Sequence, residues 1–172
     1  MSLIPVRLYG DPVLRRQAAA VDEVDDDLGR LADDMIETMR ASDGIGLAAN
    51  QVGELRRILV VNFDLETGGE GATALINPEI TARVGTMRSM EGCLSIPDVW
   101  DEVERQAEIA VTWTDPQGRE QNAEAEGLHA AVVQHEIDHL NGVLFIDHLP
   151  AVKRMMLRST LKQIARRAKE RM

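Results

Sequence analysis

Apolar residues recur at three- and four-residue spacing near the start of the chain. This spacing predicts an amphipathic helix from Asp26 to Arg40, and the acidic run Asp22–Asp27 supplies candidate N-terminal capping groups. Ser42–Gly44 marks its expected end. The apolar face that we expect to be buried consists of Leu28, Leu31, Met35, Ile36 and Met39.

Between Arg56 and Thr114 the pattern changes to short apolar and β-branched runs separated by glycine and proline. These runs predict strands, at Ile58–Phe63, Ala74–Asn77 and Ile109–Trp113. Asp115–Gly118 predicts a turn into a further strand at residues 119–124, and Thr67–Gly71 predicts a loop or hairpin tip. This part of the chain is therefore expected to form a β-sheet.

Two further helices are predicted in the last third of the chain. The first runs from about Gly127 to Asn141 and is expected to be largely buried. Its inward face consists of Leu128, Ala131, Val132, His135 and His139. The second helix follows Pro150, and its expected apolar side consists of Val152, Met155, Met156, Ile164 and Ala168.

The order of helix, strands, helix and helix predicts an α+β fold with antiparallel sheets packed around a central helix. An N-terminal helix and a basic C-terminal helix complete the expected fold. The chain has no internal repeat and no linker long enough to divide domains, so residues 1–172 are expected to form one catalytic domain.

The composition is ordinary for a soluble globular protein, with 44% hydrophobic and 28% charged residues in a chain of 172. We find no secretory signal and no apolar stretch of membrane-spanning length, so a cytoplasmic location without a membrane partner is expected. The net charge of −10 is divided unevenly, because residues 151–172 carry +7 and residues 1–150 carry −17. The acidic body and the basic tail are expected to have different roles.

The first candidate for chemistry is the segment Gln134–His139. Two histidines four residues apart lie on one face of a helix, so His135 and His139 can hold one metal ion with Glu136 beside them. The same pair could also be a solvated or hydrogen-bonded helix face.

Two other segments favour the metal interpretation. The only cysteine, Cys93, lies in Glu91–Ser95, and it could be a small buried apolar residue, a reactive thiol or a metal ligand. The segment Gly44–Gln51 is rich in glycine, which permits close backbone approach. Together the three segments point to hydrolytic metal chemistry.

These three segments resemble, in order and approximate spacing, the signature motifs of the peptide deformylase family. The resemblance extends to Asp11–Arg15, Asp34–Met39 and Gly142–Phe145, and so covers nearly the whole chain. It implies a metal-dependent hydrolase that removes the N-formyl group from the initiator methionine of nascent polypeptides and releases formate.

By the same resemblance, Cys93, His135 and His139 would hold one divalent metal ion and leave a fourth position for water. One sulfur and two nitrogen ligands admit several ions. The resemblance favours Fe²⁺ in the cell, while Zn²⁺, Ni²⁺ or Co²⁺ can occupy such a site in purified protein.

The resemblance also assigns catalytic roles. Glu136 would take a proton as metal-bound hydroxide attacks the formyl carbon, and would return that proton to the leaving amine. The Gln51 side-chain amide and the Leu94 backbone N–H would donate hydrogen bonds to the developing oxyanion.

A peptide site is implied as well. The glycine-rich segment would pair with the extended substrate like an additional strand, and the methionine side chain would enter an apolar pocket. The substrate-binding positions are Ile45, Gly46, Glu91, Leu128, Ala131 and Val132. Trp100 stands where relatives often carry arginine, and it could contact later peptide residues or cover the sheet.

A macromolecular partner is implied for the basic C-terminal helix, residues 151–172. In the family this helix is thought to bind ribosomal RNA near the exit of the nascent-chain tunnel, and cationic side chains suit phosphate. DNA is not an expected partner.

Two alternatives remain open. His135-Glu136-x-x-His139 alone is also the pattern of a zinc endopeptidase, whose third ligand lies downstream, where this chain offers Asp147 and His148. A ribosome-associated binding module with a structural metal would instead need a fourth protein ligand.

Overall fold

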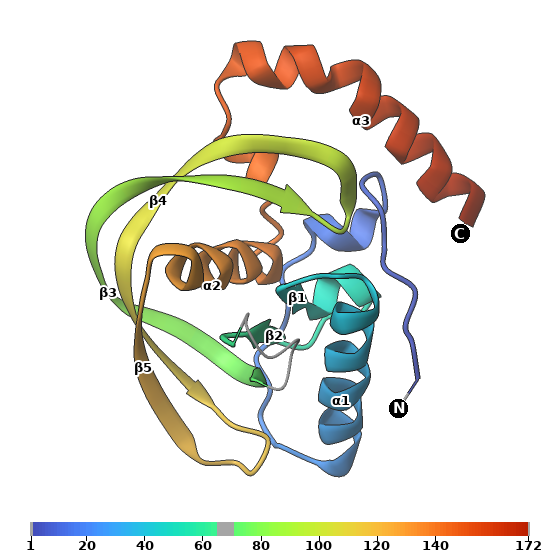
Figure 1. Ribbon diagram of the computed structural model, residues 1–172. Helices are drawn as coiled ribbons and strands as arrows, with labels where there is room; N and C mark the ends of the chain where they lie inside the picture. Colours follow the sequence, from blue (N-terminus) through green and yellow to red (C-terminus); the bar gives the residue numbers. More distant parts are fainter. Residues whose placement is uncertain (1, 65–70, 172) are drawn as a thin grey trace.

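The computed structural model describes residues 2–64 and 71–171, which fold into helices and an antiparallel sheet (Figure 1). The helices are α1 (Asp26–Ala41), α2 (Gly127–Leu140) and α3 (Ala151–Arg171), with short 3₁₀ turns η1 (Pro12–Arg15), η2 (Ala49–Val52) and η3 (Phe145–His148). The strands are β1 (Gly46–Ala48), β2 (Ile58–Asn62), β3 (Ala72–Cys93), β4 (Ile96–Thr114) and β5 (Glu120–Glu126). The α+β fold predicted from the sequence is confirmed, and the described strands form one five-stranded sheet.

Helix α1 matches its prediction to within one residue. Its first turn is capped by the Asp25 carboxylate, which accepts a hydrogen bond of 2.8 Å from the Leu28 backbone N–H. Asp26 and Asp27 in this turn also complement the helix dipole. The predicted apolar face lies inward, although Ile36 is only partly buried.

Strands β3 and β4 are much longer than the runs that predicted them. They form an antiparallel hairpin whose pairing extends, with three register shifts, from the Ile76 and Thr114 pair to the Cys93 and Ile96 pair. The part of β3 around residues 81–88 is mostly exposed and mixes polar with apolar residues, so it lacks a buried apolar face that would predict a strand. The predicted loop Thr67–Gly71 lies almost entirely outside the described residues.

Helix α2 lies inside the curve of this hairpin, and α1, β1 and β2 flank it (Figure 1). Most of its side chains are buried, which confirms the predicted central helix. Of the predicted inward face, however, Leu128 is exposed and Val132 is only partly buried. The helix ends at the predicted place, since Asn141 follows its last turn and Gly142 has φ of +75°, a left-handed conformation suited to glycine. The histidine motif is therefore carried on a rigid, buried element.

The buried apolar residues form two clusters. The first joins α1, the sheet and α2, through side chains such as Met35, Ile58 and Leu140. The second lies beside the β3–β4 turn and includes Phe145 and Ile164. No helix in the described ranges is long and apolar enough to cross a membrane.

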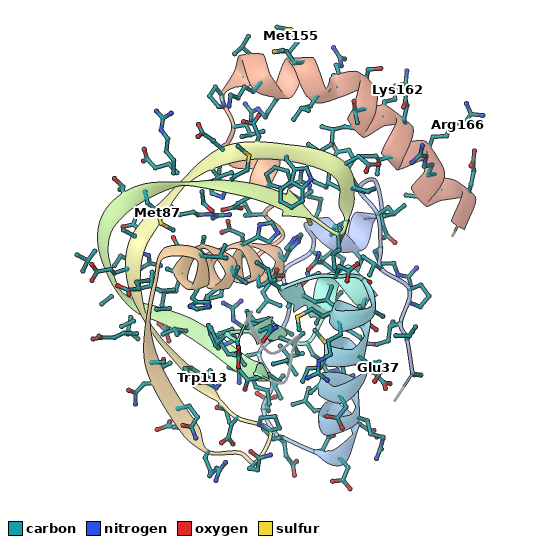
Figure 2. The ribbon with its side chains drawn as sticks, in the orientation of Figure 1. Glu37, Met87, Trp113, Met155, Lys162 and Arg166 are labelled. Atoms are coloured by element: carbon teal, nitrogen blue, oxygen red, sulfur yellow. The ribbon has the colours of Figure 1, made fainter. Side chains whose placement is uncertain are left out.

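The predicted apolar side of helix α3 is only partly buried. Leu161, Ile164 and Ala168 in its second half are buried in the second cluster. Of the predicted apolar side, however, three residues are exposed: Val152, Met155 and Met156. Figure 2 shows Met155 pointing away from the body of the protein, although Lys153 in the first turn of α3 pairs with Asp101 of β4.

Candidate metal centre and peptide cavity

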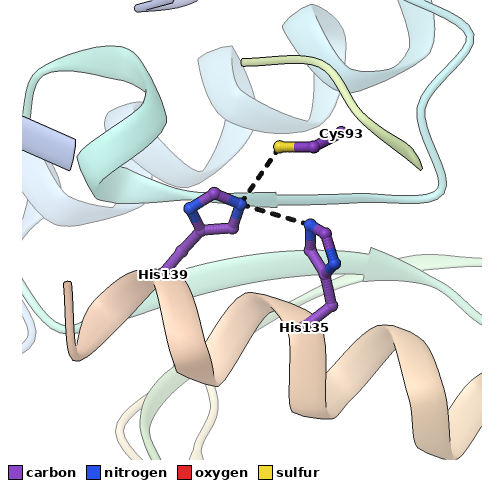
Figure 3. Close-up of side chains that lie close together, drawn as sticks. All are labelled: Cys93, His135 and His139. Atoms are coloured by element: carbon purple, nitrogen blue, oxygen red, sulfur yellow. Dashed lines mark hydrogen bonds between the residues drawn. The ribbon is translucent and has the colours of Figure 1, made fainter. Parts of the chain in front are cut away.

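Three candidate ligands come together at the centre of the fold (Figure 3). Cys93 is the last residue of β3, and the two histidines lie one turn apart on α2. The His139 Nε2 atom is 3.3 Å from Cys93 Sγ and 3.2 Å from His135 Nε2. All three potential ligand atoms lie within 4.8 Å of one another.

This donor set fits a small divalent ion. In a tetrahedral zinc-type site, bond lengths of about 2.0–2.3 Å separate the ligand atoms by roughly 3.3–3.8 Å, close to the distances found here. Burial lowers the pKa of His139 well below its ordinary value, which favours the neutral imidazole that metals bind. Burial also lowers the pKa of His135, but hydrogen bonds with Cys93 and Glu91 outweigh it and raise the value, so a metal bound there would displace a proton. In the described ranges the cluster contains only these three Cys, His or acidic residues, so a fourth position is left for water or substrate.

Glu136 lies beside the cluster and is 4% exposed. A Cβ placed on Gly46 would lie only 2.5 Å from its Oε1 atom, so the carboxylate packs directly against the β1 backbone. Its buried Oε2 atom has no hydrogen-bond partner among the described residues. Burial raises the pKa of Glu136 to about 7, a value suited to proton transfer at neutral pH.

The Gln51 side chain contacts the cysteine. Its Oε1 atom accepts a hydrogen bond of 2.8 Å from the Ala48 backbone N–H. Its Nε2 atom lies 3.5 Å from Cys93 Sγ and donates to Ser95 Oγ at 3.2 Å. Leu94, the residue between Cys93 and Ser95 in the sequence, lines the adjacent cavity.

A cavity of about 430 Å³ opens next to the cluster and is lined in part by Cys93, His135 and Glu136. The six positions expected to bind substrate all line it: Ile45, Gly46, Glu91, Leu128, Ala131 and Val132. Glu91 does more than line the cavity, because its carboxylate also contacts the Arg105 guanidinium and the His135 imidazole.

Arg105 and Asp138 are not among the site residues expected from the sequence. The buried Arg105 guanidinium donates to both Glu91 oxygens, at 2.7 and 2.9 Å, and to Asp138 at 2.6 Å. The second Glu91 oxygen also contacts His135 Nδ1 at 2.8 Å, so Arg105 acts on a candidate ligand through Glu91. Burial raises the pKa of Glu91, but hydrogen bonds from Arg105 and His135 outweigh it and lower the value to about 2.

The downstream residues considered for an endopeptidase are engaged elsewhere. His148 Nε2 contacts the Asp138 carboxylate at 2.8 Å, and Asp147 pairs with Arg15. Neither joins the cluster of Cys93 with the histidines of α2.

Comparison with known proteins agrees with this geometry. The family model described as polypeptide deformylase matches residues 3–155. The peptide deformylase of Alkalilimnicola ehrlichii is 48% identical over 169 residues, covering 98% of this chain and 94% of its own. The peptide deformylase of Rhizobium meliloti is 50% identical over 159 residues, and the match covers 91% of this chain and 91% of its own.

Solved structures agree at the level of the fold. The crystal structure of peptide deformylase from Thermus thermophilus superposes with a TM-score of 0.89 at 43% identity, covering 96% of this chain and 99% of that one. The enzyme from Legionella pneumophila has the same TM-score at 37% identity and 99% coverage of both chains. The chain therefore belongs to the peptide deformylase family of metal-dependent hydrolases.

Proposed function

We propose that Cys93, His135 and His139 bind one divalent metal ion, and that the family's reaction takes place at this centre. That reaction removes the N-formyl group from nascent peptides. The observation that carries the proposal is the convergence of one thiol and two imidazoles beside a cavity large enough for a peptide terminus. A bound ion supplies a Lewis acid that polarises the formyl carbonyl and lowers the pKa of a water molecule.

Glu136 is the proton carrier in this proposal. Its carboxylate accepts the proton that water loses on attacking the formyl carbon, and it returns the proton to the amine as the C–N bond breaks. Formate and a free N-terminus result. Its burial, its position against Gly46 and its pKa of about 7 support this role.

Gln51 and Leu94 are proposed to stabilise negative charge on the formyl oxygen, through the side-chain amide and the backbone N–H respectively. The Ala48 N–H fixes the Gln51 side chain through its oxygen, which leaves the amide nitrogen on the cysteine side of the site. Loss of one such donor typically costs roughly 3 kcal/mol of transition-state stabilisation.

The substrate is proposed to lie along Ile45 and Gly46 in an extended form, with the methionine side chain directed towards α2. Leu128, Ala131 and Val132 then supply the apolar wall, and all of these residues line one cavity. Since main-chain pairing reads little sequence, most formylmethionyl peptides would be accepted.

Ferrous iron is proposed as the ion used in the cell, with zinc, nickel or cobalt as substitutes in purified protein. The mixed sulfur and nitrogen ligand set is compatible with all four ions, whose occupancy depends on supply as much as on affinity.

The ribosome is proposed as a macromolecular partner, which also implies a cytoplasmic location. Arg158, Lys162 and Arg166 on α3 are exposed, and Figure 2 shows Lys162 and Arg166 extending outward from the helix. Such an array of cations suits the phosphates of ribosomal RNA.

The decisive experiment combines metal analysis after anaerobic purification with formate release from a formyl-Met-Ala-Ser peptide. Glu136→Gln is expected to retain the metal and lose about 10²–10⁴-fold in turnover, because only the proton carrier is removed. Cys93→Ala is expected to lose metal and activity together. Cleavage of internal bonds in casein without formate release would reject deformylation in favour of a peptidase.

A further inference from the structure

Exposed apolar side chains gather at the mouth of the cavity. Nine large hydrophobic side chains are exposed in the ranges 2–64 and 71–171. Four of them line this cavity: Ile45, Met90, Trp100 and Leu128. Large apolar groups that remain in water around a functional cavity commonly mark a surface that a ligand covers.

Trp100 is the most exposed of the four, at 69%. It is the cross-strand partner of Gly92, which immediately precedes the candidate ligand Cys93. A Cβ placed on Gly92 would lie 2.7–2.9 Å from the indole atoms Cε2, Cδ2 and Cε3. These similar distances put the middle of the ring system over the glycine, so one indole face is held against the strand and the other is open.

Met90 extends this open surface. It pairs with Glu102, two residues beyond the Gly92 and Trp100 pair, so Met90 and Trp100 lie diagonally on the same side of the hairpin. Side chains in this relation are within reach of one another when one is aromatic. A thioether and an indole together form an adaptable apolar surface.

We propose that Trp100 is a specificity-determining residue: its open face, with Met90 beside it, receives the apolar side chain of one of the two residues that follow formylmethionine. The proposal rests on the proposed function, because methionine must fill the cavity for its successors to reach the rim. An extended chain advances about 3.3 Å per residue, so the second and third residues lie roughly 3–7 Å beyond methionine. Peptides with an aromatic residue there are therefore preferred substrates.

The kinetic test compares formate release from formyl-Met-Ala-Ala, formyl-Met-Phe-Ala and formyl-Met-Ala-Phe. At least one phenylalanine peptide is expected to exceed the alanine peptide in kcat/KM by about two- to tenfold, mainly through KM, as expected for one aromatic contact. Trp100→Ala should bring the ratio of kcat/KM between the phenylalanine and alanine peptides close to one. Trp100→Phe should restore part of this preference.

Val84→Ala provides the matched control. Val84 is also an exposed apolar residue of β3, but it does not line the cavity, so the ratio should stay at the wild-type value. A ratio that is unchanged in Trp100→Ala would overturn the proposal and leave Trp100 as a cover for Gly92.

A second readout needs no turnover. Trp100 and Trp113 are the only tryptophans, so Trp113→Phe leaves Trp100 as the sole indole fluorophore. Binding of the product peptide Met-Phe-Ala or Met-Ala-Phe should shift its emission to shorter wavelength more than Met-Ala-Ala does. An emission shift of the same size with all three peptides would count against the proposal. If no peptide released formate, the proposed function would fail, while the emission shift would still decide the role of Trp100.

Discussion

At the scale of single residues, Gly46 provides the space that the Glu136 carboxylate occupies. We expect Gly46→Ala to push this carboxylate aside and to lower kcat by about 10²-fold, since a displacement of roughly 1 Å can have that effect. Formate-release kinetics measures the change, with metal content and far-UV circular dichroism expected to match wild type.

Gly29→Ala is a suitable control for this substitution. Gly29 lies in α1, and a Cβ there would meet nothing within 4 Å. The control should keep full activity. If Gly46→Ala were equally active, close packing of Glu136 against β1 would not matter for catalysis.

The pKa of Glu136 predicts how the rate depends on pH. Only the carboxylate can accept a proton, so kcat/KM should fall about tenfold per pH unit below the pKa and level off above it. Burial raises this pKa to about 7, and a nearby divalent cation would lower it, so we expect the midpoint at or below about pH 7. A pH profile of kcat/KM between about pH 5 and pH 9 tests this. A profile that is flat across neutrality and falls only in alkali would contradict the assignment.

At the scale of elements, Arg105 connects β4 to Glu91 on β3 and to Asp138 on α2. Arg105→Met would leave two largely buried carboxylates without their cation. We expect the free energy of unfolding at neutral pH to fall by about 3–5 kcal/mol. Urea unfolding measures the change, and Arg88→Met is the control, because the Arg88 and Glu102 pair on the same hairpin is exposed and should contribute under about 1 kcal/mol.

The acid dependence of this effect has a definite sign. Glu91 has a folded-state pKa of about 2, below its ordinary value of 4.5, so its ion pair stabilises the fold fully above about pH 4.5. That contribution is lost as pH falls towards 2. The difference between wild type and Arg105→Met should therefore shrink in acid, and a difference that grows there would refute the explanation.

Helix α3 combines a docked half with an exposed basic face. Truncation after Pro150 would remove Leu161 and Ile164 from the second cluster, so it would test stability as well as binding. Charge reversal is the cleaner experiment. We expect Glu at positions Arg158, Lys162 and Arg166 to abolish salt-sensitive co-sedimentation with ribosomes, because their contacts with phosphate release counterions.

The control for α3 reverses three exposed cations elsewhere, at Arg16, Arg83 and Arg88. It changes the net charge equally and should leave ribosome binding intact, and both proteins should hydrolyse a short formyl-Met peptide normally. Equal loss of binding in the two proteins would attribute association to overall charge rather than to α3.

At the scale of the whole molecule, a metal ion would join the end of β3 to α2 through Cys93 and the two histidines. Both apolar clusters are built from other buried side chains, so we expect chelator-treated protein to stay folded but inactive. If free metal stands about 100-fold above its dissociation constant, binding adds about 2.7 kcal/mol, which corresponds to a rise in Tm of roughly 5–10 °C. Calorimetry before and after chelation measures this rise, and formate release after adding back Fe²⁺ or Zn²⁺ checks the recovery of activity.

We propose that residues 1–172 form one domain, so a single unfolding transition is expected in both calorimetric scans. An unchanged Tm after complete metal removal would argue against a site that spans two elements.

The sequence by itself determined those features that depend on local periodicity. The apolar spacing located α1 and α2, and a separation of four residues put His135 and His139 on one face of a helix. Motif order then indicated the family. Such features are predictable because helical hydrogen bonds and side-chain neighbours lie within four residues of one another.

Only the tertiary structure decided which distant residues meet. The exposed stretch of β3 pairs with β4 through hydrogen bonds between strands, and the local pattern of apolar residues does not predict these. The pairing of that hairpin places Trp100 on Gly92 and brings Arg105 to Glu91. Packing of α2 inside the hairpin then brings Asp138 to Arg105 and His135 to Cys93. Met155 is exposed for a related reason: burial depends on what packs against a helix, and an apolar stripe alone cannot specify its partner.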